Sequence, residues 1–315
     1  MKLRGIDFGN VLGASGVQGF FGEGYLFHHI PGRRPDFSGM ALVSKTATLL
    51  SNKGNIPLTR NFRPRNPLPG CIKVNFWREA VLNSVRLSNP GLGALLGTGE
   101  WQKLTKPFFI SAMSLASTPK KRLEELRIMV DMIGFCKDSF SAQFGIQLNL
   151  SCQNSGHNPS ELIDESAQAL DITGTLGVPV MPKYGIDSAP IPAILKLNDH
   201  PNCDAICVSN ALKFGWQEVN WQRAWGSTKS PLAQLGGGAL SGKTLRPLVC
   251  EYIYRLRDAG FTKPINGGGG ILCSKDVVHY HIVGASSVFL GVVAILHPRR
   301  VASIIEQANN LEWRD

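Results

Sequence analysis

The sequence predicts an α/β fold: a (β/α)8 TIM barrel, with an N-terminal strand or hairpin and long inserted loops at the C-terminal face. Apolar strand-like runs alternate with helical patterns along the 315 residues, and such alternation predicts a parallel sheet. The count of about eight units favours a closed barrel. An open doubly wound sheet is the alternative, but it would need fewer strands and an early Gly-x-Gly-x-x-Gly motif, which this sequence lacks.

The first half of the chain predicts strands interrupted by one long irregular segment at 51–77, which we call the first excursion. Residues 1–19 predict a leading strand and then a barrel strand that ends in small residues. Residues 51–77 contain four prolines and form an irregular segment, and loops of this length are usually functional. The other elements expected here are strands at 40–45, 79–83 and 107–113, and helices at 20–29, 91–103 and from 119 to about 136, the last with an N-cap at Thr118.

The second half centres on a strand over 146–154. Ile146, Leu148 and Leu150 are spaced two apart, as on one strand face, and Asn149 lies on the other face. Ser151, Cys152 and Asn154 follow where this strand ends. The remaining expectations are strands at 178–184, 205–210, 264–266 and 286–292, helices at 159–176, 189–198, 243–260, 275–283 and from 298, and a second long excursion at 211–241.

Composition narrows the class of protein. A hydrophobic content of 43% allows a large core, and a net charge of +10 suits anionic ligands. A solvated basic surface is preferred over a nucleic-acid role, because no recognition motif accompanies the charge. The seven cysteines contain no Cys-x-x-Cys pair and favour a reducing cytoplasm. No run of 18 apolar residues or signal segment is seen, so no membrane span is expected.

Polar residues recur at the ends of the predicted strands. In a barrel these ends converge on one mouth, so we expect a shared site there. The residues are Ser15, Lys45, Asn83, Ser111, Asn149, Lys183 and Asn210.

The last two strands end in glycines, at 267–270 and at 291. Barrels commonly bind phosphate after strands seven and eight, and glycines let backbone N–H groups approach an anion. We therefore expect a phosphate-bearing cofactor, although a tight turn alone would also explain the glycines. Lys45 and Lys183 could pair with a carboxylate or stabilise negative charge on a cofactor ring.

Cys152 lies in a polar loop, where proton transfer is preferred over acyl transfer. His157 is disfavoured as its partner, and an inert thiol stays open. The histidines lack metal-ligand spacing with carboxylates, so no metal site is expected.

Several of these segments resemble motifs of class 1 dihydroorotate dehydrogenases, in the family's order and almost end to end. The segment 149–154, Asn-Leu-Ser-Cys-Gln-Asn, resembles the family signature Asn-Leu-Ser-Cys-Pro-Asn. Segment 83–89 resembles a substrate loop, and 14–16 and 44–46 resemble flavin-binding segments. The segments 54–57, 240–242, 269–271 and 284–286 are also similar to family motifs.

The resemblance implies an FMN-dependent oxidoreductase in which Cys152 removes a proton from dihydroorotate while hydride passes to flavin N5. Catalytic residues would be Cys152, Ser151 and Lys45. Substrate would contact Lys45, Asn83, Val85, Arg86, Leu87, Asn149, Asn154, Asn210 and Ala211. FMN would contact Ala14, Ser15, Gly16, Lys45, Thr46, Ser111, Asn149, Lys183, Ser209, Gly242, Gly268, Gly269, Gly270, Gly291 and Val292.

The chain departs from the family pattern at Gln153, Arg86, Ala211, Val292 and Pro182. A flavoenzyme for another dihydropyrimidine or cyclic amide, and a weakly catalytic FMN barrel that contacts protein or RNA, therefore stay open. The resemblance implies a homodimer, or a partner subunit with FAD and an iron–sulfur cluster if NAD is the electron acceptor. Fumarate and quinone are the other possible acceptors.

Overall fold

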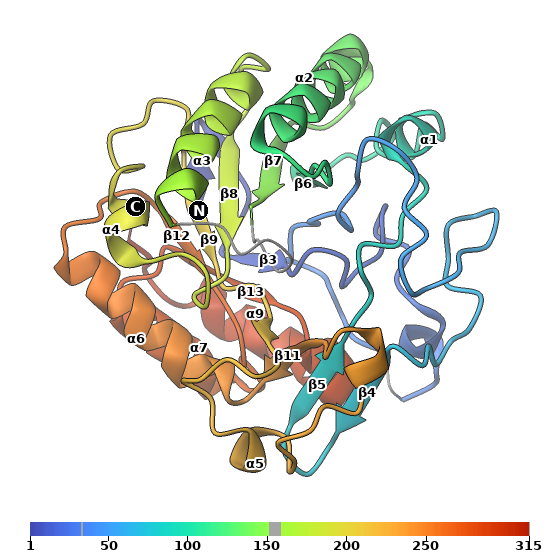
Figure 1. Cartoon of the computed structure of the whole chain (residues 1–315), viewed down its shortest axis with the longest axis vertical. Helices are drawn as coiled ribbons and strands as arrows, with labels where there is room; N and C mark the ends of the chain where they lie inside the picture. Colours follow the sequence, from blue (N-terminus) through green and yellow to red (C-terminus); the bar gives the residue numbers. More distant parts are fainter. Residues whose placement is uncertain (33, 151–158, 315) are drawn as a thin grey trace.

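The computed structural model describes residues 1–32, 34–150 and 159–314, without the side chains of 159–163. Its centre is a curled parallel sheet of seven strands in the order β3-β13-β12-β9-β8-β7-β6 (Figure 1). The strands are β3 (Val11–Gly13), β6 (Phe108–Ala112), β7 (Phe144–Asn149), β8 (Val180–Tyr184), β9 (Ile206–Val208), β12 (Ile265–Gly267) and β13 (Ser287–Leu290).

Residues 40–47 fill the gap between the two edge strands of this sheet. Ala41 forms a parallel bridge to Leu12 of β3, and Val43 forms one to Phe109 of β6. The backbone N–H of Ala41 donates to Val11 at 2.9 Å, and that of Phe109 donates to Leu42 at 2.9 Å. The extended segment therefore occupies the eighth position and joins the edges, as a TIM barrel requires.

The amino-terminal end of the barrel is closed by a hairpin of β1 (Lys2–Leu3) and β2 (Ile6–Asp7). Its apolar side chains form one buried cluster with the barrel interior, and the Phe8 and Phe109 rings lie 4.2 Å apart. Cys207 belongs to this cluster and Cys203 to the other one, so both thiols pack in the core. With this end filled, a ligand can enter only from the carboxyl ends of the strands.

Helices cover the outside of the sheet. In α2 (Pro119–Cys136), the Thr118 hydroxyl accepts the backbone N–H of Lys121, which confirms the expected N-cap. The other helices are α1 (Leu92–Leu96), α3 (Pro159–Gly174), α4 (Ile191–Leu195), α5 (Trp221–Ala224), α6 (Leu245–Asp258), α7 (Ser274–Ile282), α8 (Val293–Leu296) and α9 (Val301–Asn309). Four short 3₁₀ helices are η1 (Leu26–His29), η2 (Lys137–Ser139), η3 (Ala233–Leu235) and η4 (Pro298–Arg300).

A second sheet stands beside the barrel mouth, where Figure 1 shows β4, β5 and β11 next to one another. It is antiparallel, in the order β10-β11-β5-β4, and we call it the side sheet. Its strands are β4 (Ile72–Asn75), β5 (Ala80–Asn83), β10 (Leu212–Lys213) and β11 (Ala239–Gly242). One face buries the neighbours Leu82, Leu240 and Leu212 completely, while the opposite face carries Asn83 and Ala239.

The structure corrects five expected elements. The strand at 79–83 exists, but it belongs to the side sheet because residues 72–75 fold back onto it as a hairpin. The helix at 20–29 is reduced to η1, since Gly22 and Gly24 adopt left-handed backbone angles. The helix at 91–103 stops at Leu96, ahead of glycines 97 and 99, and the one at 189–198 is shortened to α4. Residues 40–45 make single bridges rather than a continuous ladder.

Among the described residues, no helix is long and apolar enough to cross a membrane.

Candidate active site

One large cavity, of about 1780 Å³, opens at the carboxyl ends of the barrel strands. Its walls come from two sources, the barrel mouth and the side sheet with its flanking loops. Predicted site residues that line it are Ala14, Ser15, Gly16, Lys45, Thr46, Asn83, Val85, Arg86, Leu87, Asn149, Lys183, Ser209, Asn210, Ala211, Gly269, Gly270, Gly291 and Val292. The fold therefore brings most of the predicted residues to one place.

Three predicted residues do not line the cavity. Ser111 is fully buried and donates to or accepts from the Thr46 hydroxyl at 2.9 Å. Gly242 and Gly268 lie behind the wall, where a Cβ would collide with the Glu79 backbone and the Phe289 ring. Ser151, Cys152 and Asn154, as well as Gln153, lie outside the described residues.

Lys45 lies in the segment 40–47 that completes the barrel, and it lines the cavity. Its ammonium donates to the backbone oxygen of Ser88 and lies 5.0 Å from the centre of the Phe20 ring. Burial lowers the pKa of Lys45 to about 8, and the nearby Glu23 carboxylate opposes this shift. A cation whose charge is this poorly solvated gains by binding an anion.

Lys183 ends β8 and is only 6% exposed. Its ammonium lies 5.1 Å from the centre of the Phe289 ring. Burial lowers the pKa of Lys183, and the thiol of Cys207 partly opposes this. Within the described part of the chain, no hydrogen bond or ion pair satisfies this ammonium, so it is available to a ligand in the cavity.

Polar side chains of the barrel mouth orient one another. Asn210 Nδ2 donates to Asn149 Oδ1 at 3.0 Å, which sets the direction of both amides. The Ser15 hydroxyl donates to the backbone oxygen of Ser44 and lies 2.9 Å from the Thr46 hydroxyl. These contacts hold hydrogen-bonding groups in place before any ligand binds.

The loop after β5 is held by amide side chains from the first excursion. Asn52 Nδ2 donates to the backbone oxygens of Arg86 at 2.8 Å and Leu87 at 3.2 Å, and Asn55 Nδ2 donates to Ser84 at 2.6 Å. Arg86 and Leu87 have φ values of +52° and +54°, which non-glycine residues rarely adopt. The surrounding hydrogen bonds therefore impose this loop shape.

The glycine segments leave no room for side chains. A Cβ on Gly270, whose φ is +72°, would lie 2.6 Å from the backbone oxygen of Gly242, and one on Gly291 would lie 3.0 Å from the Ala14 Cβ. Backbone N–H groups can therefore approach a ligand closely. With the ammonium of Lys183, these glycines form a cradle that can accept an anionic group.

Among the described residues, no group of three His, Cys, Asp or Glu side chains could hold a metal ion.

Several cavity residues were missed at the sequence level. Arg63 and Lys73 belong to the first excursion, Lys213 to the second, and Arg122 to α2. Seven Lys and Arg stand in residues 37–78 without one Asp or Glu, and this bias was the signal that could have revealed a charged wall.

Comparisons with known proteins agree with this geometry. A family model described as dihydroorotate dehydrogenase matches residues 1–311. The catalytic subunit of dihydroorotate dehydrogenase B (NAD(+)) from Caldicellulosiruptor bescii is 25% identical over 97% of this chain and 91% of its own length. The subunit of the same name from Anoxybacillus flavithermus is 26% identical over 98% of this chain and 88% of its own length.

Proposed function

The chain belongs to the dihydroorotate dehydrogenase family, and we propose that it is an FMN-dependent enzyme that oxidises (S)-dihydroorotate to orotate in pyrimidine biosynthesis. The single observation that carries the proposal is the convergence of Lys45, Lys183 and the three asparagines 83, 149 and 210 on one cavity. Residues 1–315 would form one FMN-binding barrel domain.

The fit of the cavity to FMN supports a flavin-dependent oxidoreductase that acts on CH–CH groups. When bound, FMN supplies the acceptor for hydride from the substrate. Lys183 would hold negative charge on the cofactor, because its ammonium has no other partner in the described chain. Gly269, Gly270 and Gly291 would admit the phosphate, with Ser15 and Thr46 beside them.

The chain's own residues would position the substrate. Lys45 would bind the carboxylate of dihydroorotate, and Asn83, Asn149 and Asn210 would bind the amide groups of its ring. The hydrogen bond between Asn149 and Asn210 would keep both amides in a single orientation. Cys152 would accept the proton from the substrate, as the family resemblance implies, with Ser151 beside it.

A related activity on another dihydropyrimidine is the second candidate. The cavity residue Ala211 carries no hydroxyl to donate to substrate, and Arg86 adds a charge to the substrate loop. Both features alter how a ring substituent would be recognised.

Anaerobic titration of the FMN-loaded protein tests the proposal. Dihydroorotate should bleach the yellow flavin, Cys152→Ala should prevent bleaching at an unchanged FMN content, and dihydrouracil should leave the flavin oxidised. If dihydrouracil bleaches the flavin and dihydroorotate does not, the second candidate replaces the first.

The relatives named above are catalytic subunits of NAD(+)-linked enzymes, so we propose that electrons leave this chain through a further subunit. Reoxidation of the reduced protein separates the acceptors: fumarate alone should react slowly, and NAD+ should require the partner. Homodimerisation and a cytoplasmic location stay predictions, of which the first is measurable by light scattering.

A further inference from the structure

Two aromatic side chains protrude from the hairpin of β4 and β5. The turn between these strands spans residues 76–79, and the backbone N–H of Glu79 donates to the backbone oxygen of Phe76 at 3.2 Å. Phe76 is 59% exposed, and Trp77 is 98% exposed, the largest value for a large apolar side chain in the described chain. We call these two residues the aromatic tip. Single apolar side chains on a surface need no explanation, but adjacent ones mark a contact site.

The second excursion braces the hairpin behind the aromatic tip. Asn75 Nδ2 donates to the backbone oxygen of Trp225 at 2.8 Å, and Arg78 Nη1 donates to that of Arg223 at 3.1 Å. Within the hairpin, the backbone N–H of Arg78 donates to Asn75 Oδ1 at 3.1 Å. These bonds tie both flanks of the turn to the protein while the Trp77 ring points into solvent. The exposure of Trp77 therefore belongs to a structured turn.

Cations accompany the aromatic tip. Lys73 and Arg78 of the hairpin and Arg223 of its brace are all exposed. Residues 60–78 contain five Lys and Arg and no Asp or Glu. The acid that follows them, Glu79, is already compensated, because its carboxylate lies 3.0 Å from the Lys243 ammonium and 3.0 Å from His297 Nε2. An ordinary solvated surface would mix both signs, so this one is selectively basic.

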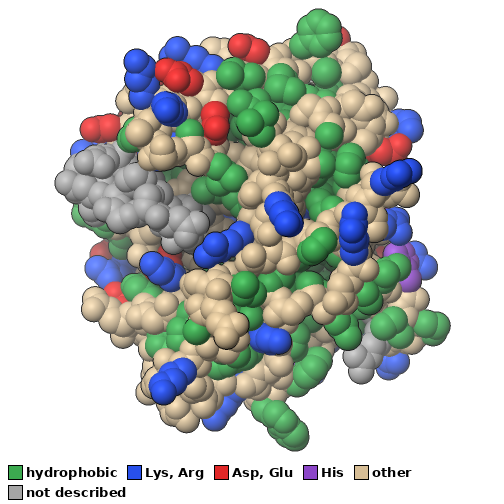
Figure 2. Space-filling model, turned by 45° about the vertical axis from the view of Figure 1, so that its right-hand side comes forward, with side chains coloured by type: hydrophobic (Ala, Val, Ile, Leu, Met, Phe, Trp, Pro, Cys, Tyr) green, Lys and Arg blue, Asp and Glu red, His purple; other side chains and the backbone are tan. Residues whose placement is uncertain are grey.

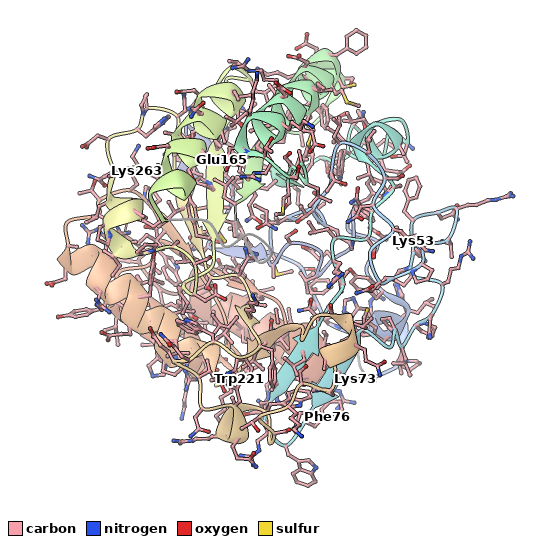
Figure 3. The ribbon with its side chains drawn as sticks, viewed as in Figure 1. Lys53, Lys73, Phe76, Glu165, Trp221 and Lys263 are labelled. Carbon is pink, nitrogen blue, oxygen red and sulfur yellow. The ribbon has the colours of Figure 1, made fainter. Side chains whose placement is uncertain are left out.

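Apolar and positive groups share this side of the molecule. Figure 2 turns forward the right-hand side of Figure 1, where β4 lies, and shows Lys and Arg among hydrophobic side chains, with Asp and Glu toward the upper and left-hand parts. Figure 3 places Lys73 and Phe76 next to each other at the hairpin, away from Glu165. A partner that approaches the hairpin would therefore meet aromatic rings and cations together.

An anionic lipid bilayer matches this combination. Aromatic rings, tryptophan above all, favour the membrane interface, and Lys and Arg are attracted to anionic headgroups. A second copy of this chain would bring like charge against like charge. A stable protein interface covers about 800 Å² on each partner, more than two side chains at one turn supply. Single-stranded nucleic acid is bound in basic grooves with several stacking rings, whereas the aromatic tip protrudes.

We propose that the aromatic tip docks peripherally on an anionic lipid bilayer. The rings of Phe76 and Trp77 insert among the headgroups, and the cations Lys73, Arg78 and Arg223 bind lipid phosphates. Because Lys73 and Phe76 also line the cavity, docking holds the cavity rim beside the bilayer. The docking surface goes beyond the proposed function and does not depend on it.

Co-sedimentation of the purified full chain with lipid vesicles tests the docking. The wild type should bind vesicles of phosphatidylcholine mixed with phosphatidylglycerol, bind pure phosphatidylcholine far more weakly, and dissociate at high salt. Trp77→Ala should weaken binding about 10- to 100-fold, because an inserted tryptophan buries on the order of 100 Å² of apolar surface. Trp77→Phe should restore part of the affinity, and Arg78→Gln should weaken binding about fivefold. Neither Trp77 nor Arg78 lines the cavity.

Phe135→Ala is the matched control. Phe135 is 93% exposed on α2, which Figure 1 shows at the opposite end of the molecule from β4, and Asp131 and Asp138 stand near it in the sequence. This variant should bind vesicles as the wild type does. An equal loss in Phe135→Ala and Trp77→Ala would overturn the proposal, as would a wild type that does not bind anionic vesicles.

Fluorescence identifies the inserted residue. Lipids brominated in their acyl chains should quench the emission of the wild type on binding, and the quenching should be lost in Trp77→Ala. Equal quenching in both proteins would place the contact elsewhere and overturn the aromatic tip as the docking site. If oligouridylate binds through Trp77 and anionic vesicles do not bind, the surface is a nucleic-acid site and the proposal fails. Because no readout uses turnover, these outcomes are independent of whether dihydroorotate reduces the flavin.

Discussion

The two walls of the cavity are built in different ways. The barrel wall presents polar groups at the ends of buried strands, where Asn149, Asn210, Ser15 and Thr46 hydrogen-bond to one another or to backbone. The side-sheet wall presents exposed cations from its strands and loops, and Arg86 and Lys213 are held there through their backbone rather than their side chains. If the proposed function holds, the barrel wall would hold the cofactor, and the side-sheet wall would contact the substrate.

The junction of the two walls should be the most sensitive point. Lys45→Ala removes a cation of the barrel segment 40–47 that donates to the backbone oxygen of Ser88 in the loop after β5. Loss of a buried charge that binds substrate costs about 3–4 kcal/mol, so kcat/KM for dihydroorotate should fall about 10²- to 10³-fold. Steady-state kinetics measures the loss. A wild-type kcat/KM in this variant would show that Lys45 does not bind the substrate.

Disturbing the barrel wall should weaken binding of the cofactor. In Gly270→Ala, a Cβ would meet the Gly242 oxygen at a φ of +72°. The strain should lower the free energy of unfolding by about 1–3 kcal/mol and weaken FMN binding. Thermal unfolding and fluorescence titration of the apoprotein with FMN give the two quantities. Unchanged FMN affinity would indicate that the phosphate binds elsewhere.

The charge of Lys45, at the junction of the two walls, should also make KM for dihydroorotate depend on pH. Lys45 has a pKa of about 8, so its cationic form prevails below that pH and is lost above it. KM for dihydroorotate should therefore rise up to about tenfold per pH unit above pH 8. In Lys45→Arg the guanidinium stays charged, and this rise should vanish from the pH profile. A rise that persists in the arginine variant would assign it to another group.

Loosening the side-sheet wall should leave the cofactor seat intact. Asn52→Ala removes two hydrogen bonds to the backbone of Arg86 and Leu87. At about 0.5 kcal/mol each, the low end for exposed hydrogen bonds, their loss should raise KM about fivefold through a less ordered loop, while FMN affinity stays constant. A parallel drop in FMN affinity would show that the two walls do not act separately.

The barrel wall was largely predictable from the sequence. The polar residues Lys45, Asn149, Lys183 and Asn210 follow apolar strand runs, and the parallel strands of a barrel must end on one side, so their convergence followed from topology. The predicted place of Asn83 at the end of a barrel strand was wrong. Asn83 lines the cavity, but it ends a strand of the side sheet, outside the barrel. An apolar run of four residues looks alike in a parallel barrel and in an antiparallel hairpin.

Ser111 shows a second limit. It ends a barrel strand as predicted, yet it lies behind Thr46 and does not reach the cavity. Side-chain direction at a strand end depends on which face turns inward, and a shift of one residue reverses it.

By itself, the sequence determined the alternation of strands and helices, the glycines at the last two strand ends and the motif order that placed the chain in its family. Only the tertiary structure decided that residues 72–83 leave the barrel, and that Asn83, Ala239 and Lys213 stand in one row of the side sheet. The reason is physical: periodicity and turn residues act over a few neighbours along the chain, whereas the pairing of Asn83 with Ala239 joins segments 156 residues apart.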